Sequence, residues 1–439
     1  MGQTIFVPRE ADANEPRVAA SPDTAKRLKG LGFDVVVERG AGLASRIPDE
    51  EFEKAGATLG GAADAAKADV VLKVRRPTAS ELKSYKKGAM VIATMDPYGN
   101  EAEVAAMANA GISAFAMEFM PRITRAQSMD VLSSQANLAG YRAVVDAAAE
   151  YDRALPMMMT AAGTVPAAKV FVMGAGVAGL QAIATARRLG AVVTATDVRA
   201  AAGEQVASLG AKFIMTDALK DASGQGGYAR ELTEEEKRAQ AELVAEHISK
   251  QDIVITTALI PGRPAPRLVT AEMIASMRPG SVIVDLAVER GGNVEGAVPG
   301  KTVTTANGVK ILGHLNMPGR VAASASLLYA RNLFAFLETM VDKQTKTLSI
   351  NFEDELVKAT VLTHEGAVVH PNFAGAAAAA PKPSPADPEV VKAAQGTEPG
   401  LEVAPKKASG RRSAAEKPAE AVKPRSTRKS AMPKTGGDA

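Results

Sequence analysis

The chain has 439 residues, a formal net charge of +3 and no cysteine. Its length predicts two or three domains, and the absence of cysteine excludes disulfides, thiolate metal sites and cysteine nucleophiles. Because the basic excess lies after about residue 376, we expect a slightly acidic folded body that does not bind nucleic acid.

Short apolar runs alternate with helical segments along the first part of the chain, which predicts an α/β domain. Strands are expected at residues 3–7, 34–38, 70–74, 90–94 and 113–118, and helices at 23–30, 49–55, 79–84 and 101–110. A long helix at 129–153 then crosses into a second domain. Its strands are expected at 170–172, 191–196, 212–215, 252–258, 281–286 and 309–312, and its helices at 234–249 and 271–277. Helical stretches at 321–337 and 338–342 would return the chain to the first domain.

The predicted fold class is therefore α/β, with two doubly wound, Rossmann-like domains and a cleft between them. The first domain is discontinuous, comprising 1–134 and 325–375, and the second is 135–324. Residues 376–439 are rich in Ala, Pro, Lys and Arg and poor in large apolar residues. Such a segment cannot bury enough surface to offset its ordering entropy, so we expect a disordered tail. The sequence predicts neither a signal peptide nor a membrane span.

The segment from Val170 to Asp197 has the order strand, glycine turn, helix, strand and carboxylate that is typical of a dinucleotide-binding unit. Gly174, Gly176 and Gly179 form the pattern GxGxxG, with helix amides that can receive phosphates. Asp197 stands where the fingerprint places a ribose-binding carboxylate, and this favours NAD over NADP. Arg199 leaves the other preference open, because an arginine just past this position can accommodate a 2′-phosphate.

A second polar segment, from Pro121 to Gly140, precedes the crossing helix and is expected at the mouth of the cleft. Arg122 and Arg125 could pair with phosphate, and Gln127 could bond the carboxamide of a nicotinamide. Asp130 and Ser133 could hold ribose hydroxyls or orient Arg122. Helix capping and a surface ion pair are the alternative explanation. Farther on, the glycine-rich stretch DASGQGGYARELTEEE predicts a mobile loop.

This polar segment resembles a known family, as do GAGVAGLQAIATARRLGA, TALIPGRPAP, MRPGSVIVDLAVERGGN and GHLNMPGR. The family is the NAD(H)-binding alpha subunit of proton-translocating NAD(P) transhydrogenase, which is related to alanine dehydrogenase, and the resemblance runs from about residue 3 to 370. It implies direct hydride exchange between NAD(H) on this chain and NADP(H) on a beta subunit. It also implies a homodimer, a membrane-spanning partner subunit, and a peripheral location at the cytoplasmic face of the inner membrane.

The resemblance also implies a role for individual residues. The nicotinamide end of the cofactor would be surrounded by Arg122, Ile123, Thr124, Arg125, Gln127, Asp130 and Ser133. The pyrophosphate would lie over Gly174, Ala175, Gly176, Val177 and Gly179, and the adenosine ribose beside Asp197, Val198 and Arg199. Gly227 and Tyr228 match the tip of the family's mobile loop, and Gln240 and Leu259 match positions on the adenosine side. Leu259 also follows the carboxyl end of a strand, whereas a solvated helix position is the default interpretation of Gln240.

Alanine dehydrogenase is the alternative, since Arg17 and Lys73 match residues that bind the substrate in that family. Its histidine is missing from the loop here written TMDPYGN, and its DQGG reads Glu289-Arg290-Gly291-Gly292. His314 remains a candidate, for which a structural role is favoured. A further alternative is a scaffold that senses NAD without turnover. No metal site is predicted.

Overall fold

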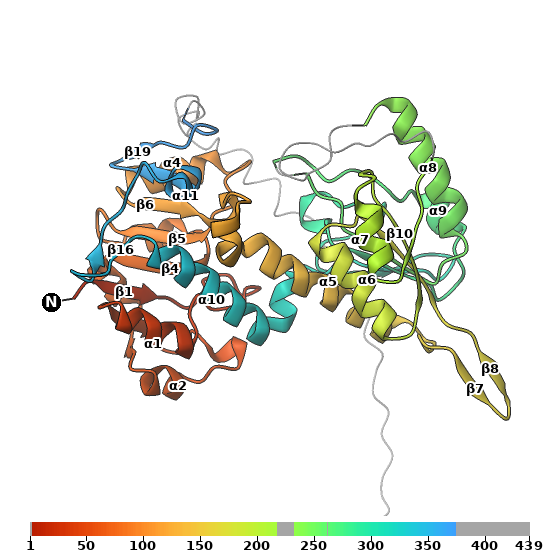
Figure 1. Cartoon of the computed structure of the whole chain (residues 1–439), viewed down its shortest axis with the longest axis horizontal. Coiled ribbons are helices and arrows are strands. Elements are labelled where there is room, and N and C mark those ends of the chain that lie inside the picture. Colours follow the sequence, from red (N-terminus) through yellow and green to blue (C-terminus); the bar gives the residue numbers. More distant parts are fainter. Residues whose placement is uncertain (1, 217–231, 261, 375–439) are drawn as a thin grey trace, which may run out of the picture. The chain divides into compact units, whose positions relative to one another are not determined.

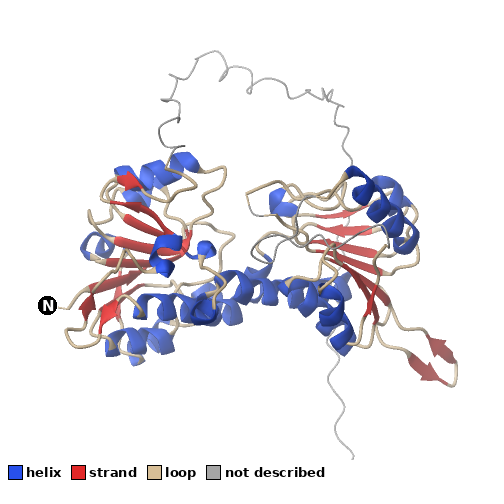
Figure 2. Cartoon of the chain, turned by 45° about the horizontal axis from the view of Figure 1, so that its top comes forward, coloured by secondary structure: helices blue, strands red, loops and turns tan. Residues whose placement is uncertain are grey.

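The structure is a computed structural model that describes residues 2–216, 232–260 and 262–374. Two large β-sheets form its framework, and helices flank each of them (Figures 1 and 2). Within these ranges no helix is both long enough and apolar enough to cross a membrane. The predicted α/β class with two Rossmann-like units is confirmed, and the cleft and the exact domain boundaries stay predictions.

The first sheet is doubly wound and receives strands from both ends of the chain. Parallel strands run in the order β3, β2, β1, β4, β5, β6, and antiparallel β18 and β19 extend the sheet beyond β6. The strands are β1 (Thr4–Val7), β2 (Asp34–Glu38), β3 (Thr58–Gly60), β4 (Val70–Arg75), β5 (Met90–Thr94), β6 (Ser113–Ala116), β18 (Val361–His364) and β19 (Ala367–Val368). The helices are α1 (Pro22–Gly30), α2 (Asp49–Lys54), α3 (Ala79–Leu82), α4 (Glu101–Asn109), α10 (Ala322–Glu338) and α11 (Glu355–Thr360). This unit is therefore discontinuous in sequence, as predicted.

The second sheet has the order β11, β10, β9, β12, β13, β15, β14, and only β14 is antiparallel. Its strands are β9 (Lys169–Met173), β10 (Val192–Thr196), β11 (Lys212–Phe213), β12 (Ile253–Thr256), β13 (Val282–Asp285), β14 (Thr302–Thr304) and β15 (Lys310–Leu312). Its helices are α6 (Val177–Arg188), α7 (Ala202–Ser208), α8 (Glu234–Ile248) and α9 (Ala271–Ala275). Along β9, Val170 and Val172 face one apolar cluster while Phe171 and Met173 face another. This two-sided burial explains the uninterrupted apolar run.

The long helix α5 (Val131–Glu150) belongs to both cores. Val131 at its start packs in the first unit's core, whereas Ala143, Val144 and Ala147 pack in the second unit's core. Between them, Gly140 lies against α6, where a Cβ would be only 2.0 Å from the carbonyl oxygen of Ala178. Only glycine permits so close an approach of the two helices.

Two predicted elements are wrong and several strands were missed. The segment 338–342 is not helical, because α10 ends at Glu338 and β16 (Val341–Asp342) pairs with β17 (Thr347–Leu348). The Asp342 carboxylate accepts the amides of residues 344 and 345 and so fixes the turn of this hairpin. The strand expected to reach 118 ends at Ala116, where a 3-10 turn begins. The hairpin of β7 (Met158–Thr160) and β8 (Gly163–Val165) was not predicted, nor were β3, β14, β18 and β19.

The Gly140 contact generates a stability prediction. Gly140→Ala should destabilise the protein by about 1–3 kcal/mol and lower its thermal midpoint, because a methyl group must push α5 away from the α6 backbone. Gly30→Ala is the matched control: this helical glycine has no atom within 4 Å of the position that a Cβ would take, so its replacement should be neutral or stabilising by up to about 1 kcal/mol. Equal midpoints for the two variants in thermal unfolding monitored by circular dichroism would contradict the proposed role of Gly140.

Candidate functional site

The glycine turn between β9 and α6 has the geometry that a pyrophosphate site needs. Gly174 has a φ of +102°, which a residue with a side chain rarely adopts. A Cβ on Gly179 would lie 1.8 Å from the carbonyl oxygen of Gly174, so the helix packs on the strand only without a side chain there. Gly176 caps the N-terminus of α6 and has no atom within 4 Å of its Cβ position. The amides at the start of α6, which have no partner within the helix, can therefore receive an anion next to Gly176.

Asp197 follows β10 directly and joins this strand to the glycine turn. Its carboxylate accepts the backbone N–H of Ala175 at 2.7 Å, and the side chain is buried. It also accepts three N–H groups of Arg199: the backbone N–H at 2.9 Å, Nε at 2.8 Å and Nη2 at 2.8 Å. Burial by itself would raise the pKa of the Asp197 carboxyl, but these hydrogen bonds and the charge of Arg199 outweigh it and lower the pKa. Asp197 is therefore ionised at neutral pH.

Gln240 and Leu259 lie near the same end of the sheet. Gln240 on α8 is buried, and its Nε2 donates to the hydroxyl of Thr196 at 3.3 Å, one residue before Asp197. The default interpretation of Gln240 as a solvated position is therefore wrong. Among the described residues its Oε1 has no hydrogen-bond partner, and a buried acceptor of this kind is costly unless a ligand satisfies it. Leu259 follows β12 and is 45% exposed.

The polar segment before α5 is anchored to the first unit's core and turns its polar side chains outward. Ile123, Ala126 and Met129 contact the apolar core, and residues Thr124–Met129 form a 3-10 turn, η4. Arg122, Thr124 and Gln127 are exposed. Asn332 on α10 holds the segment in place, since its Nδ2 donates to the carbonyl of Ser128 and its Oδ1 accepts the Ser134 hydroxyl, both at 2.7 Å.

Asp130, Ser133 and Arg125 already have partners within the protein. Asp130 caps α5 and accepts both the amide and the hydroxyl of Ser133, at 2.9 and 2.5 Å. The guanidinium of Arg125 binds Asp354 at 2.7 Å and Glu355 at 3.2 Å on the surface. These contacts are those of the alternative explanation of this segment: helix capping for Asp130 and Ser133, and a surface ion pair for Arg125. Gly227 and Tyr228, at the expected loop tip, lie outside the described residues.

Arg17 and Lys73 are buried in the first unit beside carboxylates. Arg17 donates to both oxygens of Glu15 at 2.7 Å and to Gln135 at 2.8 Å. Lys73, which has no exposed surface, lies 2.6 Å from Glu81 and 3.2 Å from Glu10. Burial opposes the charge of Lys73, but these two carboxylates prevail and raise its pKa. Both cations are therefore already neutralised by protein groups.

The loop written TMDPYGN is supported by a residue that sequence reasoning missed. The Glu118 carboxyl accepts the amides of Met95 and Asp96, and its burial raises its pKa. The sequence did offer a sign of this residue, because Glu118 is a single carboxylate just after a buried strand, and parallel sheets place functional groups at the carboxyl ends of their strands. Asp96 in turn forms an ion pair with Arg290 from the turn after β13. His314 is half-buried, and burial and the charge of Arg320 lower its pKa, so it is neutral at pH 7.

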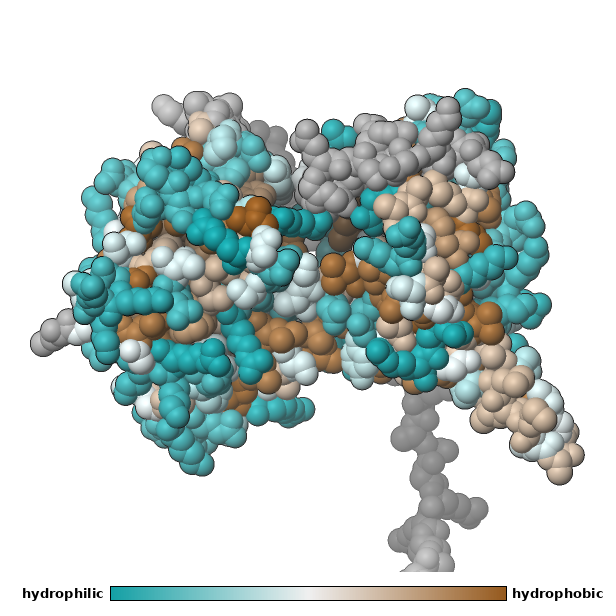
Figure 3. Space-filling view, viewed as in Figure 1, coloured by the Kyte–Doolittle hydropathy of each residue, from teal (hydrophilic) through white to brown (hydrophobic). Residues whose placement is uncertain are grey.

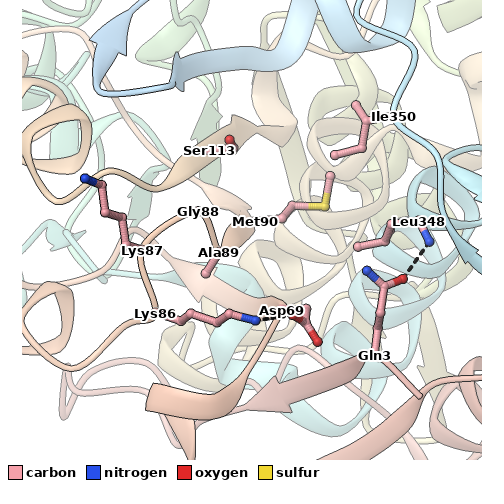
Figure 4. Close-up of a pocket in the computed structure, with 10 residues that line it drawn as sticks. All are labelled: Gln3, Asp69, Lys86, Lys87, Gly88, Ala89, Met90, Ser113, Leu348 and Ile350. Atoms are coloured by element: carbon pink, nitrogen blue, oxygen red, sulfur yellow. Dashed lines mark hydrogen bonds and ion pairs between the residues drawn. The ribbon is translucent and has the colours of Figure 1, made fainter. Parts of the chain in front are cut away.

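A cavity of about 300 Å³ lies at the amino ends of β4, β5 and β6, away from all these residues (Figure 4). Its polar groups bind one another: Lys86 pairs with Asp69 at 2.6 Å, and Gln3 accepts the amide of Leu348 at 2.6 Å. Parallel sheets bind ligands at the opposite, carboxyl ends of their strands. We therefore assign no role to this cavity.

Comparisons with known proteins agree on the family. Family models described as "Alanine dehydrogenase/PNT, N-terminal domain" and "Alanine dehydrogenase/PNT, C-terminal domain" match residues 6–139 and 143–371. The first part of NAD(P) transhydrogenase subunit alpha from Rhodospirillum rubrum is 56% identical over 380 residues, which cover 84% of this chain and 99% of that protein. Alanine dehydrogenase of Halomonas elongata is 30% identical, over 83% of this chain and 94% of that protein.

A solved structure of transhydrogenase from Sinorhizobium meliloti is 68% identical, with a TM-score of 0.75, and covers 84% of this chain and 100% of that one. The C-terminal family model also spans α10, β18 and β19, which fold with the first sheet. From the two matched family models and the identity of its relatives, the chain belongs to the alanine dehydrogenase/PNT family.

Proposed function

We propose that this chain is the NAD(H)-binding component of a proton-translocating NAD(P) transhydrogenase, and that it exchanges hydride directly with NADP(H) on a partner subunit. The observation that carries the proposal is the joining of the glycine turn to Asp197, 2.7 Å apart at the carboxyl ends of β9 and β10. The strand order reverses at β9, which has β10 on one side and β12 on the other, and doubly wound sheets bind dinucleotides at the carboxyl ends of the strands beside such a switch point. The likeness to the subunit from Rhodospirillum rubrum supports the specific activity.

In this proposal the adenosine half of NAD(H) lies beside Asp197, with Val198, Arg199, Gln240 and Leu259 around it. The ribose diol takes up hydrogen bonds that Arg199 now gives to Asp197, so the arginine side chain must turn aside on binding. A 2′-phosphate would instead meet the ionised carboxylate. The free Oε1 of Gln240 accepts a hydrogen bond from the ligand.

The nicotinamide half lies at the segment from Arg122 to Ser133, where it meets the nicotinamide of the partner. Hydride transfer between two nicotinamide rings needs apposition and exclusion of water, without an acid or a base. The exposed Arg122 and Gln127 orient the ring. Asp130, which caps α5 and accepts the amide and hydroxyl of Ser133, fixes the turn from which they project. Ile123 and Thr124 complete the set of residues around the nicotinamide ring.

The remaining candidate activity is that of an alanine dehydrogenase, favoured by the buried Arg17 and Lys73. An amino-acid dehydrogenase must move a proton as well as a hydride, and the loop TMDPYGN offers no histidine for this step. The carboxylates on Arg17 and Lys73 also oppose the entry of a substrate carboxylate. Transhydrogenase activity requires neither a proton-transferring histidine nor a binding site for a substrate carboxylate, and we therefore prefer it.

The proposed assembly is a homodimer with a membrane-spanning subunit and an NADP(H)-binding beta subunit, located at the cytoplasmic face of the inner membrane. The β7–β8 hairpin supports the dimer, because it projects from the second unit with an apolar surface (Figure 3). Met158, Met159 and Val165 on this hairpin are 43%, 76% and 38% exposed. Apolar side chains that gather on an exposed arm mark a protein contact.

The role of Asp197 is tested by Asp197→Asn. Removing the charge should weaken NADH binding about tenfold and narrow the preference over NADPH, since the carboxylate bonds to ribose are lost and the repulsion of a 2′-phosphate disappears. Fluorescence titration with both nucleotides measures the change. If Asp197→Asn binds NADPH more tightly than the unmutated protein, the double variant Asp197→Asn/Arg199→Met should lose this gain, because Arg199 would no longer pair with the 2′-phosphate. Equal affinity of the unmutated protein for the two nucleotides would refute the adenosine site.

The role of Arg122 is tested by Arg122→Ala. Hydride transfer to an NADP-loaded partner should fall about tenfold or more while NADH affinity changes less, because the segment sets the nicotinamide geometry and the adenosine half supplies most of the binding. Arg331→Ala, at an exposed arginine of α10, controls for loss of surface charge. A pure loss of affinity with unchanged turnover would count against this role.

The two candidate activities are separated by an assay of the protein alone. With NADH, pyruvate and ammonia it should show almost no oxidation of NADH, since the amination lacks the roughly 10²- to 10⁴-fold that a placed acid or base contributes. Addition of an NADP(H)-binding partner should produce hydride transfer. Rapid amination without the partner would favour alanine dehydrogenase, and nucleotide binding without turnover in either assay would favour a sensing scaffold.

A further inference from the structure

Asn293 has no exposed surface, and its side chain joins both ends of one segment that follows β12. Its Oδ1 accepts the amide of Ala258 at 3.1 Å, and its Nδ2 donates to the carbonyls of Ala258 at 2.9 Å and Pro266 at 2.8 Å. Its own carbonyl accepts the amides of Leu268 and Val269 at 2.8 and 3.0 Å. One buried amide side chain therefore replaces the regular ladder where the chain leaves the sheet.

The segment that Asn293 holds lies against the glycine turn. Thr257, next to Ala258, donates from its hydroxyl to the carbonyl of Gly174 at 3.1 Å. A Cβ on Gly174 would lie 2.4 Å from the same hydroxyl, so the Thr257 side chain occupies the space beside Gly174. Leu259, on the other side of Ala258, is exposed at the carboxyl end of the sheet. A shift of Ala258 would therefore move both the support of the glycine turn and a wall of the adenosine site.

Asn293 is itself held from the strand side. Asp285, the last residue of β13, is fully buried and accepts the amides of Ala287 at 2.9 Å and Val294 at 3.0 Å. A Cβ on Gly292 would come within 2.7 Å of this carboxylate, so only glycine fits before Asn293. The turn that carries Asn293 is thus fixed to the sheet independently of the segment that it holds.

We propose that Asn293 is a positioning residue of the nucleotide site, which acts by holding Ala258 and Thr257 against the glycine turn. The inference rests on the proposed binding of NAD(H). It concerns a residue that does not contact the nucleotide and that has no titratable group of its own. Its effect on NADH affinity therefore runs through Ala258 and Thr257.

Replacement by aspartate distinguishes positioning from general packing. Asn293→Asp keeps the shape and the acceptor for Ala258, but it turns a second oxygen toward the carbonyls of Ala258 and Pro266. The ionised form repels these oxygens, whereas the protonated form donates to one of them. Burial and the charge of Asp285, which accepts the amide of Val294, should raise the pKa of the new carboxyl. Arg267 opposes this shift from its bond to the carbonyl of Val294, whereas Arg290 is ion-paired with Asp96. The variant should therefore recover affinity at lower pH.

Asn307 provides the matched control. Its Nδ2 donates to the carbonyls of Ile274 at 3.0 Å and Met277 at 3.2 Å, and its Oδ1 accepts the hydroxyl of Thr305 at 2.7 Å. It thus binds backbone carbonyls in the same unit, at the end of α9 and away from the glycine turn. Asn307→Asp should cost stability for the same physical reason without touching the nucleotide site.

The experiment is an NADH fluorescence titration of the full chain and its variants at pH 8 and pH 6, with urea unfolding on the same samples. At pH 8, Asn293→Asp and Asn293→Ala should each bind NADH on the order of tenfold more weakly than the unmutated chain. At pH 6, Asn293→Asp should recover most of the lost affinity, measured against the unmutated chain at that pH. Asn293→Ala should recover none of it. Asn307→Asp should bind within about twofold of it at both pH values.

The inference is overturned if both Asn293 variants bind NADH normally, if Asn293→Asp shows no recovery, or if Asn307→Asp loses as much affinity. Should Asn293→Asp fail to fold, Asn293→Ala against Asn307→Asp still decides the question, since only the former should lose affinity. Failure of the proposed function has a different result, because the unmutated chain would then not bind NADH at either pH.

Discussion

The site depends on one charged hydrogen bond, from the amide of Ala175 to the carboxylate of Asp197. The hydrogen-bonded ladder between β9 and β10 ends at Gly174, whose amide donates to the carbonyl of Thr196 at 2.9 Å and whose positive φ turns the chain away from the strand. The carboxylate ties this turn to the end of the neighbouring strand, and the helix α6 then begins at a defined place. Because Arg199 keeps Asp197 ionised in a buried position, the tie remains in place throughout the neutral range of pH.

The two halves of the proposed site differ in their physical character. Around the adenosine half the polar groups are buried and bonded to backbone or to neighbouring side chains, as Asp197, Gln240 and Asn293 show. Around the nicotinamide half Arg122 and Gln127 are exposed, and their segment is held by apolar side chains in the core and by the hydrogen bonds of Asn332. This division suits a protein whose cofactor must be held at one end and offered to a second nicotinamide at the other.

The periodicity of apolar residues and the spacing of the glycines predicted most of this fold and the position of the glycine turn beside Asp197. The apolar runs 70–74 and 170–172 are strands buried on both faces. The pattern GxGxxG followed by Asp197 is a specific signal, because each of its residues meets a separate geometric requirement of the turn. Short edge strands such as β14 and β19 could not be predicted, because pairing with an existing sheet, and not their own pattern, makes them strands. The contacts of Gln240, Glu118 and Asn293 were missed for a related reason. Each acts through groups that are distant in sequence, and a polar residue in a helix or loop gives no sign of such partners.

The contact between Asp96 and Arg290 joins the two places where the sequence departs from the pattern expected of alanine dehydrogenase. One departure is the loop TMDPYGN without its histidine, and the other is Glu289-Arg290 where that family has aspartate and glutamine. In the structure these positions meet, and the residues found there form an ion pair. Arg290 stands where that family has glutamine, and its guanidinium cannot exchange a proton near neutral pH, so this position supplies neither an acid nor a base. Glu118 fixes the backbone of Met95 and Asp96 for the same contact. The two departures from the alanine dehydrogenase pattern are therefore linked in the structure, because the residues found there hold the loop after β5 to the turn after β13.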